Sequence, residues 1–397
     1  MTKRVALAYS GGLDTSVAVA WLGIEQGYEV VAVIVDVGQE ADFEALSRRA
    51  AAAGAVEVVV VDAREELLAD IAMPCLAANA LYEGRYPLVS ALSRPVIVRH
   101  LVAAARQHGA TAVAHGATGK GNDQVRFEVG TRALAPDLEI LAPVRVWGMS
   151  REQTIDYADK HDIAVTVSKE RIYSIDSNLW GRAIECGILE DPWEAPPDDV
   201  FALTVPTATE PVEVTIGFDK GVPVSLDGSG LGLVELVEKL GALVGSEGYG
   251  RIDIVEGRRV GIKSREVYEC PAALALIMAH ADLEGLTLEH DVAHEKARIE
   301  PRFAELVYDG MWFSPLRNAL SAFMTSTQQS VTGEVRVRFS PGGGAEVVGR
   351  RSPVGLYVYD LATYDAADAF NHLDAEGFVR LWGLGIQTWA ARQGGAE

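Results

Sequence analysis

A glycine-containing run near the N-terminus is the first segment whose residue types could do chemistry. Residues 10–16 read Ser-Gly-Gly-Leu-Asp-Thr-Ser and lie between an apolar run at 5–8 and a helical pattern at 15–26. Two glycines let the backbone approach a ligand closely, and a helix that follows offers unpaired N–H groups to an anion. No Gly-Lys-Ser/Thr follows, so the run is not a Walker loop. A tight turn with a hydroxyl cap is the alternative, but we favour a pyrophosphate-binding loop.

A second polar run follows a predicted strand at 111–114. Residues 115–126 read His-Gly-Ala-Thr-Gly-Lys-Gly-Asn-Asp-Gln-Val-Arg. Thr118, Asn122, Asp123 and Arg126 supply donors, an acceptor and a permanent cation, a set that suits a zwitterionic amino acid. The alternative is a glycine loop whose polar groups are simply solvated.

The elements around these runs alternate between strand and helix. A buried strand is expected at 5–8 and further strands at 29–35, 56–61, 111–114 and 138–141, with helices at 15–26, 43–53, 95–108 and 150–161. Strands that are apolar on both faces and alternate with helices predict an α/β, doubly wound parallel sheet. Both polar runs would then lie beyond strand ends, where such sheets bind ligands.

After about residue 165 the pattern changes to hairpins and helices. Hairpins are expected at 212–226 and 334–348, and helices at 231–243, 271–284 and 290–308, which is typical of an α+β domain. An amphipathic C-terminal helix carries Trp382 and Trp389, and docking on a partner subunit or on its own chain both remain open. We therefore expect three parts: a nucleotide-binding domain at 1–165, a synthetase domain at 166–362 and an oligomerisation helix at 363–397.

The composition excludes several classes of function. The chain carries 35 basic and 56 acidic residues, so its formal charge of −21 disfavours general nucleic-acid or membrane-surface binding. Three distant cysteines without a C-x-x-C pair suit a reducing compartment. No apolar run approaches the roughly 18 residues of a membrane span. We expect a cytoplasmic protein.

The first run resembles the phosphate loop of the ATP-pyrophosphatase family, whose members attack the α-phosphate of ATP and release pyrophosphate. Together with the second run and several later motifs, the chain resembles the argininosuccinate synthetase family from about residue 3 past residue 360. The later motifs are Leu-Tyr-Glu-Gly-Arg-Tyr at 81–86, Ser-Arg-Pro at 93–95, Tyr-Ser-Ile-Asp-Ser-Asn-Leu at 173–179, Gly-Arg-Ile-Asp-Ile-Val-Glu at 250–256 and Gly-Ile-Lys-Ser-Arg-Glu-Val-Tyr-Glu at 261–269.

This resemblance implies a ligase that joins L-citrulline to L-aspartate through citrullyl-AMP in arginine biosynthesis. It implies ATP contacts at Ala8, Tyr9, Ser10, Gly11, Gly12, Leu13, Asp14, Thr15, Ser16 and Gly116. It implies aspartate contacts at Thr118, Asn122 and Asp123, and citrulline contacts at Tyr86, Asn122, Arg126, Ser174, Glu256 and Tyr268. Some relatives have hydroxyl residues at the positions of Ala91 and Ala183, so neither alanine is included.

Catalysis in such a ligase would rest on positioning and charge stabilisation, because the substrate oxygen is itself the nucleophile. Arg94 and Lys120 are candidate cations for the developing charge, and Asp14 is a candidate contact for the Mg²⁺ that accompanies ATP. No side chain of the motifs is an evident base for the aspartate amine, and no protein metal site is expected. The family also implies a homotetramer.

Two other functions use the same kind of loop. A tRNA-adenylating thiolation enzyme would need a basic face and a catalytic cysteine pair, whereas this chain is acidic with scattered cysteines. A nucleotide sensor without turnover would leave the polar motifs after residue 165 unexplained. His290 and His294 have the spacing of a zinc-protease helix, but we expect a solvated helix face because no third ligand is evident.

Overall fold

The computed structural model describes residues 3–164, 173–365 and 368–394. The described chain divides into two compact units, Met1–Val354 and Gly355–Glu397. The predicted boundary between residues 165 and 166 lies outside the described residues.

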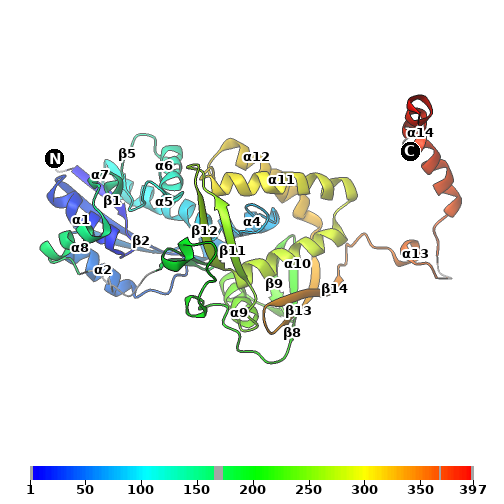
Figure 1. Ribbon diagram of the computed structural model, residues 1–397, viewed down its shortest axis with the longest axis horizontal. Helices are drawn as coiled ribbons and strands as arrows, with labels where there is room; N and C mark the ends of the chain where they lie inside the picture. The colour runs from blue at the N-terminus through cyan, green and yellow to red at the C-terminus, as the bar shows by residue number, and fades with distance from the viewer. Residues whose placement is uncertain (1–2, 165–172, 366–367, 395–397) are drawn as a thin grey trace. The chain divides into compact units, whose positions relative to one another are not determined.

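A five-stranded parallel sheet forms the N-terminal part of the first unit (Figure 1). Its strand order is β3 (Glu57–Asp62), β2 (Tyr28–Asp36), β1 (Lys3–Ala8), β4 (Ala112–Ala114) and β5 (Glu139–Leu141). All four pairings are parallel, as the alternating pattern predicted. Strand β2 lies on one side of β1 and β4 lies on the other, so the strand order reverses direction between β1 and β4. Parallel sheets bind ligands at such a switch point, beyond the carboxyl ends of the two strands.

Helices cover both faces of this sheet. Val5 and Leu7 pack with α1 (Leu13–Ile24), while Ala6 and Ala8 pack with α5 (Val89–Gln107). Successive side chains of a strand point to opposite faces, so both faces must be apolar. The remaining helices of this part are α2 (Phe43–Ala52), α3 (Arg64–Glu66), α4 (Met73–Ala77), α6 (Asp123–Leu134), α7 (Pro143–Trp147) and α8 (Arg151–Lys160), with a π-helical turn at Leu67–Ala72.

Helix α5 begins earlier than the sequence indicated. We expected a helix at 95–108, but α5 starts at Val89 and contains Pro95. Val89, Ala91 and Leu92 are buried, so packing of the first turn outweighs the usual preference of proline for a helix start. The extra turn matters because α5 contacts both the parallel sheet and a hairpin of the following part, and it carries Arg94 between them.

The rest of the first unit contains two antiparallel sheets, in agreement with the predicted α+β character. One has the order β11 (Arg251–Gly257), β12 (Lys263–Glu269), β7 (Gly181–Glu185) and β6 (Ser174–Asn178). The other has the order β10 (Ser229–Gly230), β9 (Val222–Leu226), β8 (Val212–Asp219), β13 (Gly333–Ser340) and β14 (Gly344–Arg351). Short 3-10 turns lie at Gly187–Glu190, Asp198–Val200 and Gln328–Ser330.

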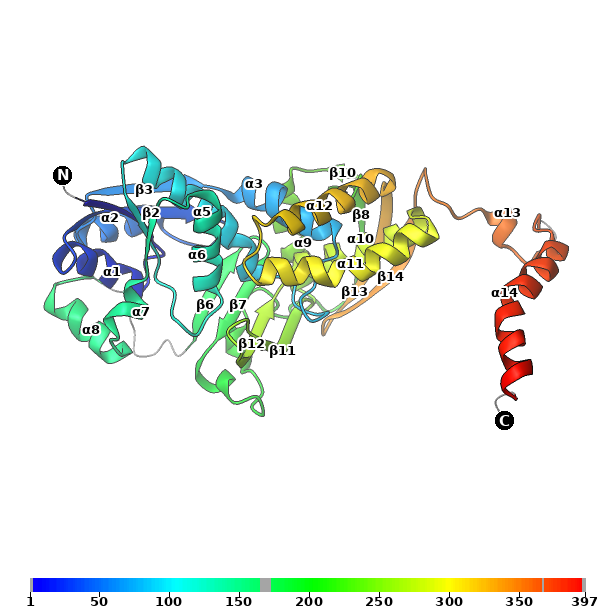
Figure 2. The same cartoon turned by 90° about the horizontal axis from the view of Figure 1, so that it is seen from above.

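This part also contains four helices: α9 (Leu233–Gly245), α10 (Pro271–Thr287), α11 (His290–Tyr308) and α12 (Pro315–Thr327). Helix α10 contacts α9, β13 and β14, and α11 runs beside α12 (Figure 2). The hairpins β6–β7 and β11–β12 were not expected as strands, although the motifs at 173–179, 250–256 and 261–269 cover most of β6, β11 and β12.

The second unit contains α13 (Tyr359–Ala362) and α14 (His372–Gln393). Asn371 caps α14 by accepting a hydrogen bond from the Leu373 N–H. Phe378 and Trp382 stack along the helix with their ring centroids 5.8 Å apart. A C-terminal helix with aromatic residues is thus confirmed. Among the described helices of the chain, none combines the length and apolar character needed to cross a bilayer.

Candidate functional site

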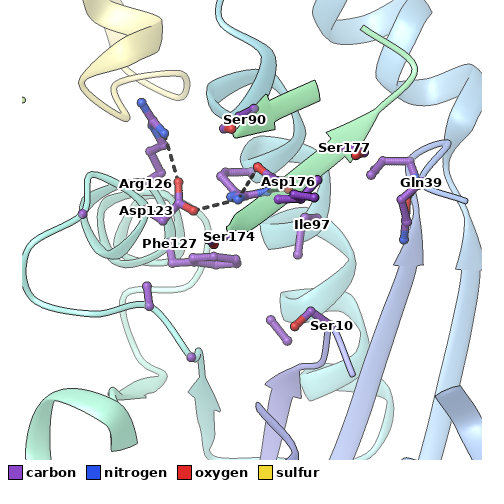
Figure 3. Close-up of a pocket in the computed structure, with 18 of the residues that line it drawn as sticks. Ser10, Gln39, Ser90, Ile97, Asp123, Arg126, Phe127, Ser174, Asp176 and Ser177 are labelled. Carbon is purple, nitrogen blue, oxygen red and sulfur yellow. Dashed lines mark hydrogen bonds and ion pairs between the residues drawn. The ribbon is translucent and has the colours of Figure 1, made fainter. Parts of the chain in front are cut away.

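The two polar runs lie at the switch point of the parallel sheet and share one cavity of about 540 Å³. The first run follows β1 and the second follows β4, as the sequence analysis expected. The rest of the wall comes from β2 and the segment that follows it, from α2 and α5, and from the hairpins β6–β7 and β11–β12. Figure 3 shows Ser10 on one side of this cavity, with Ser174, Asp176 and Asp123 on the other.

The loop between β1 and α1 is organised by its own hydroxyl groups. The Ser10 and Thr15 hydroxyls share a hydrogen bond of 3.1 Å, and those of Tyr9 and Ser16 share one of 3.0 Å. Gly12 is the N-cap of α1. Because glycine has no side chain, it offers no acceptor to the first N–H groups of the helix. The first N–H groups of α1 are therefore available to a ligand, which suits an anion.

Gly11 needs to be glycine for two reasons. Its φ is +75°, a region that other residues rarely adopt. A Cβ atom at this position would also overlap Cδ2 of Leu46, which lines the cavity. Arg49, from α2, donates a 2.8 Å hydrogen bond to the Gly11 carbonyl and so fixes the turn from outside. Sequence reasoning did not identify Arg49, because it lies 38 residues away.

The second loop meets the first at Gly116. A Cβ atom at Gly116 would lie 2.7 Å from Cγ2 of Thr15, so only glycine allows the two loops to approach this closely. The next turn is ordered from within, because the Ala117 N–H donates to Nδ1 of His115 at 3.2 Å. Burial lowers the pKa of His115, which keeps this nitrogen an acceptor at neutral pH.

Asn122 connects this loop to the hairpin β11–β12. Its Oδ1 accepts a 3.0 Å hydrogen bond from the Arg259 N–H, and the Lys120 carbonyl accepts from Arg258 at 3.4 Å. Asn122 is buried and lines the cavity, so its amide NH₂ is the group left to face a ligand.

Two arginines hold Asp123. Arg94 donates from Nη2 to Asp123 at 2.7 Å and to Asp176 at 2.7 Å, and Arg126 donates to Asp123 at 2.9 Å (Figure 3). Burial by itself would raise the pKa of Asp123, but the charges of Arg94 and Arg126 outweigh it and lower the pKa to about 2. Asp123 is therefore a carboxylate at all working pH values.

A second group of polar side chains lies around Glu256. Strand β11 alternates, with Ile252, Ile254 and Glu256 buried on one face. The Tyr268 hydroxyl donates to Glu256 at 3.1 Å, and the Tyr268 ring stacks on Tyr86 with centroids 4.1 Å apart. Burial raises the pKa of Glu256, while hydrogen bonds from two tyrosines and the charge of Arg126 oppose that rise.

The structure brings most of the predicted site residues to this cavity. Those that line it are Ala8, Tyr9, Ser10, Asp14, Thr15, Tyr86, Arg94, Gly116, Thr118, Asn122, Asp123, Arg126, Ser174, Glu256 and Tyr268. Gly11, Gly12, Leu13 and Ser16 build the loop behind the lining residues. Lys120 is exposed and lies outside the lining set.

Other lining residues were not predicted as site residues. They include Gln39, Ser90, Ile97, Phe127, Asp176, Ser177, Glu185, Arg258 and Glu266. Arg258 pairs with both Glu185 and Glu266. Burial, together with the charges of Glu185 and Glu256, raises the pKa of Glu266 to about 9 against the effect of Arg258. Only the motifs Tyr-Ser-Ile-Asp-Ser-Asn-Leu and Ser-Arg-Glu-Val-Tyr-Glu could have suggested Asp176 and Glu266.

His290 and His294 are exposed on α11, and the described residues contain no group of three or more His, Cys, Asp or Glu side chains suited to a metal ion. Cys75, Cys186 and Cys270 are free thiols, and burial raises the pKa of each. A thiolate nucleophile is therefore disfavoured.

Two family models match most of the chain. The family model described as "Arginosuccinate synthase N-terminal HUP domain" matches residues 4–164, and the model described as "Arginosuccinate synthase C-terminal domain" matches residues 173–389.

Three curated relatives cover almost the whole chain, and each carries the name argininosuccinate synthase. The protein of Bacillus pumilus is 56% identical over 385 residues, which is 96% of this chain and 95% of the relative. That of Anoxybacillus flavithermus is 54% identical over 394 residues, or 98% of each chain. That of Bacillus licheniformis is 55% identical over 385 residues, again 96% and 95%. This chain belongs to the argininosuccinate synthase family.

Proposed function

We propose that this chain is an ATP-dependent carbon–nitrogen ligase that condenses L-citrulline with L-aspartate to argininosuccinate, with release of AMP and pyrophosphate. The family membership supports this reaction over nearly the full length of the chain. The observation that carries it is the shared cavity, where an anion-binding loop faces a cluster of arginine, carboxylate and tyrosine side chains.

ATP is assigned to the loop of Ala8 to Ser16 and to Gly116. The triphosphate would bind at the N-terminus of α1, where the free N–H groups, the helix dipole and the hydroxyls of Ser10 and Thr15 favour negative charge. Mg²⁺ is expected with the ATP, where it would neutralise phosphate charge. Asp14 fits a role beside it, because its carboxyl group lines the cavity in the first turn of α1.

The two amino acids are assigned to the opposite wall. Thr118, Asn122 and Asp123 would bind aspartate, and Tyr86, Asn122, Arg126, Ser174, Glu256 and Tyr268 would bind citrulline. Asn122 belongs to both sets, and the hydrogen bond from Arg126 to Asp123 joins one set to the other. These two links would hold the two substrates next to each other.

The proposed reaction then needs two nucleophilic displacement steps. In the first, the ureido oxygen of citrulline forms a bond to the α-phosphorus of ATP, and pyrophosphate leaves with the electron pair of the broken P–O bond. In the second, the aspartate amine, after losing a proton, bonds to the ureido carbon and AMP leaves. Arg94 lines the cavity and is the stronger candidate for stabilising developing charge; Lys120 would have to turn inward from its exposed position.

The proposal also covers the roles of the parts of the chain, its assembly and its location in the cell. We assign nucleotide binding to residues 1–165, amino-acid binding to residues 166–362, and subunit contacts to the helix within residues 363–397. A cytoplasmic homotetramer is expected for this family, and the stacked aromatics of α14 would suit a helix that packs on another subunit.

The direct test is isotope exchange between pyrophosphate and ATP. The protein is incubated with ATP, Mg²⁺ and labelled pyrophosphate, with or without citrulline. We expect label to enter ATP only when citrulline is present, and argininosuccinate to form only when aspartate is added. Exchange that ignores citrulline and requires tRNA would reject the ligase and support the thiolation enzyme instead.

A further inference from the structure

Tyr308 is the last residue of α11, and no motif of the sequence pointed to it. Its side chain is fully buried, and it lies behind the residues that line the cavity. Gly310 follows two residues later with a φ of +75°, and a Cβ atom there would lie 2.9 Å from Cα of Arg126. The end of α11 is therefore pressed against the start of α6 at the site.

Tyr308 contacts two residues of the proposed citrulline site at once. Its hydroxyl donates to Oε1 of Glu256 at 2.6 Å. Its backbone carbonyl accepts from Nε of Arg126 at 3.1 Å, and the Arg126 guanidinium lies 5.1 Å from the centre of its ring. One residue thus holds both the carboxylate and the guanidinium that are expected to bind the two charged groups of an amino acid.

The ring of Tyr308 has little freedom to turn. It stacks on Tyr82 with centroids 3.5 Å apart and planes 3° from parallel, and it meets Tyr86 edge-on at 6.3 Å. The Tyr82 hydroxyl has a different partner from that of Tyr308, because it donates to the Gly257 carbonyl at 2.6 Å. This packing directs the Tyr308 hydroxyl to Glu256 before any substrate arrives.

The charge on Glu256 depends on these tyrosines. Burial raises the pKa of Glu256, and the hydrogen bond from Tyr308 is the largest of the effects that lower it. Tyr308 remains a donor throughout, because burial and the neighbouring Glu256 both raise its own pKa. Without the Tyr308 hydroxyl, Glu256 would take up a proton at higher pH.

We propose that Tyr308 is a positioning residue for citrulline, which keeps Glu256 ionised and oriented and fixes Arg126 through its backbone and ring. The inference rests on the proposed function, because it assigns Glu256 and Arg126 to the same substrate. It adds a residue that reaches the substrate only through its neighbours.

Tyr308→Phe removes only the hydroxyl and leaves the ring stack. In the citrulline-dependent exchange assay, we expect the KM for citrulline to rise about tenfold, in line with the loss of a hydrogen bond to a charged group, while the KM for ATP stays constant. The acid limb of kcat/KM for citrulline should also move to higher pH, because it reports the ionisation of Glu256 in the free enzyme.

Tyr82→Phe is the matched control. It removes a hydroxyl from the other ring of the same stack, but that hydroxyl binds the Gly257 carbonyl and not Glu256. Tyr82→Phe should therefore not shift the acid limb of kcat/KM for citrulline. If Tyr308→Phe leaves both the KM for citrulline and the acid limb unchanged, or if Tyr82→Phe moves the limb equally, Tyr308 has only a structural role.

A double-mutant cycle tests whether Tyr308 acts through Glu256. Glu256→Gln removes the buried charge, so adding Tyr308→Phe to it should cause little further loss of citrulline binding. Additive losses would contradict action through Glu256. If the wild-type protein itself shows no citrulline-dependent exchange, the proposed function fails, which is a different result from failure at Tyr308.

Discussion

Nη2 of Arg94 lies 2.7 Å from Oδ2 of Asp123, and the same nitrogen lies 2.7 Å from Asp176. Arg94 comes from α5, Asp123 from the start of α6 and Asp176 from β6, so one guanidinium joins three elements at the cavity. Asp176 gives Arg94 a second counter-ion if Asp123 turns to a substrate ammonium. We therefore expect the two half-reactions to be separable by mutation.

Asp123→Asn should harm the aspartate step more than the citrulline step. It removes the charge proposed to meet the aspartate ammonium, and we expect the overall rate at low aspartate to fall by about 10- to 100-fold, as for a lost charged hydrogen bond. Citrulline-dependent exchange should fall less, because Arg126 keeps its contacts with Tyr308.

Asp137→Asn is the control for this variant, since Asp137 forms a similar two-bond pair with Arg106 on the surface. It should change neither step. Equal losses in exchange and in the overall reaction for Asp123→Asn would mean that Asp123 does not serve aspartate in particular.

The pH dependence of citrulline use should follow Glu256. Because burial raises its pKa above the ordinary glutamate value, Glu256 loses its charge as pH falls through that raised pKa. We therefore expect kcat/KM for citrulline to decrease on the acid side, with a midpoint above about 4.5. Glu256→Gln should lower kcat/KM and remove this limb, which a pH series of exchange rates would detect. A limb that persists in Glu256→Gln would assign it to another group.

Gly11→Ala should weaken ATP binding. The new methyl group would displace Leu46 into the cavity and would strain a backbone with positive φ. We expect the KM for ATP to rise about tenfold, the equivalent of roughly 1.4 kcal/mol. Gly27→Ala has almost the same φ, +70°, but open space around the new atom, so it should cost only stability. If both variants keep the wild-type KM for ATP, the turn at Gly11 does not shape the nucleotide site.

Lys296→Met should destabilise the fold far from the cavity. Lys296 is buried on α11 and donates to Glu284 at 3.0 Å and to Glu300 at 2.5 Å. Removing it leaves two carboxylates without their cation, which costs about 3–5 kcal/mol for buried pairs and lowers the melting temperature by roughly 10 °C.

Lys239→Met provides the comparison for Lys296→Met, because the pair of Lys239 with Glu235 on α9 is exposed and also spans four residues. Its melting temperature should change by about 1 °C or less. Similar shifts for the two variants would show that burial does not decide the cost.

Much of the sheet could be predicted from local patterns. The strands β1, β2 and β3 are valine-rich or apolar on both faces, and the helix expected at 290–308 is α11 with the same bounds. The meeting of the two polar runs followed from general rules for parallel sheets, and Gly116 against Thr15 now shows how close they come.

The hairpins that complete the site were harder to predict. In β11, Ile252 and Ile254 alternate as in a strand, but Glu256 occupies the next buried position and ends the apolar pattern. Strand β6 reads Ser-Ile-Asp-Ser-Asn, where function rather than a core determines the residue types. Arg49 and Tyr308 act through contacts to Gly11 and Glu256 that are 38 and 52 residues distant, and no local pattern encodes such contacts.

The central claim is that the turn of residues 10–16 binds the triphosphate next to a bound citrulline. A crystal structure of the protein with ATP and citrulline tests it most directly. We predict the phosphates against the N-terminus of α1, with the ureido oxygen facing the α-phosphorus from the side of Arg126 and Glu256. A triphosphate bound elsewhere, with the turn at Ser10 to Ser16 empty, would contradict the account.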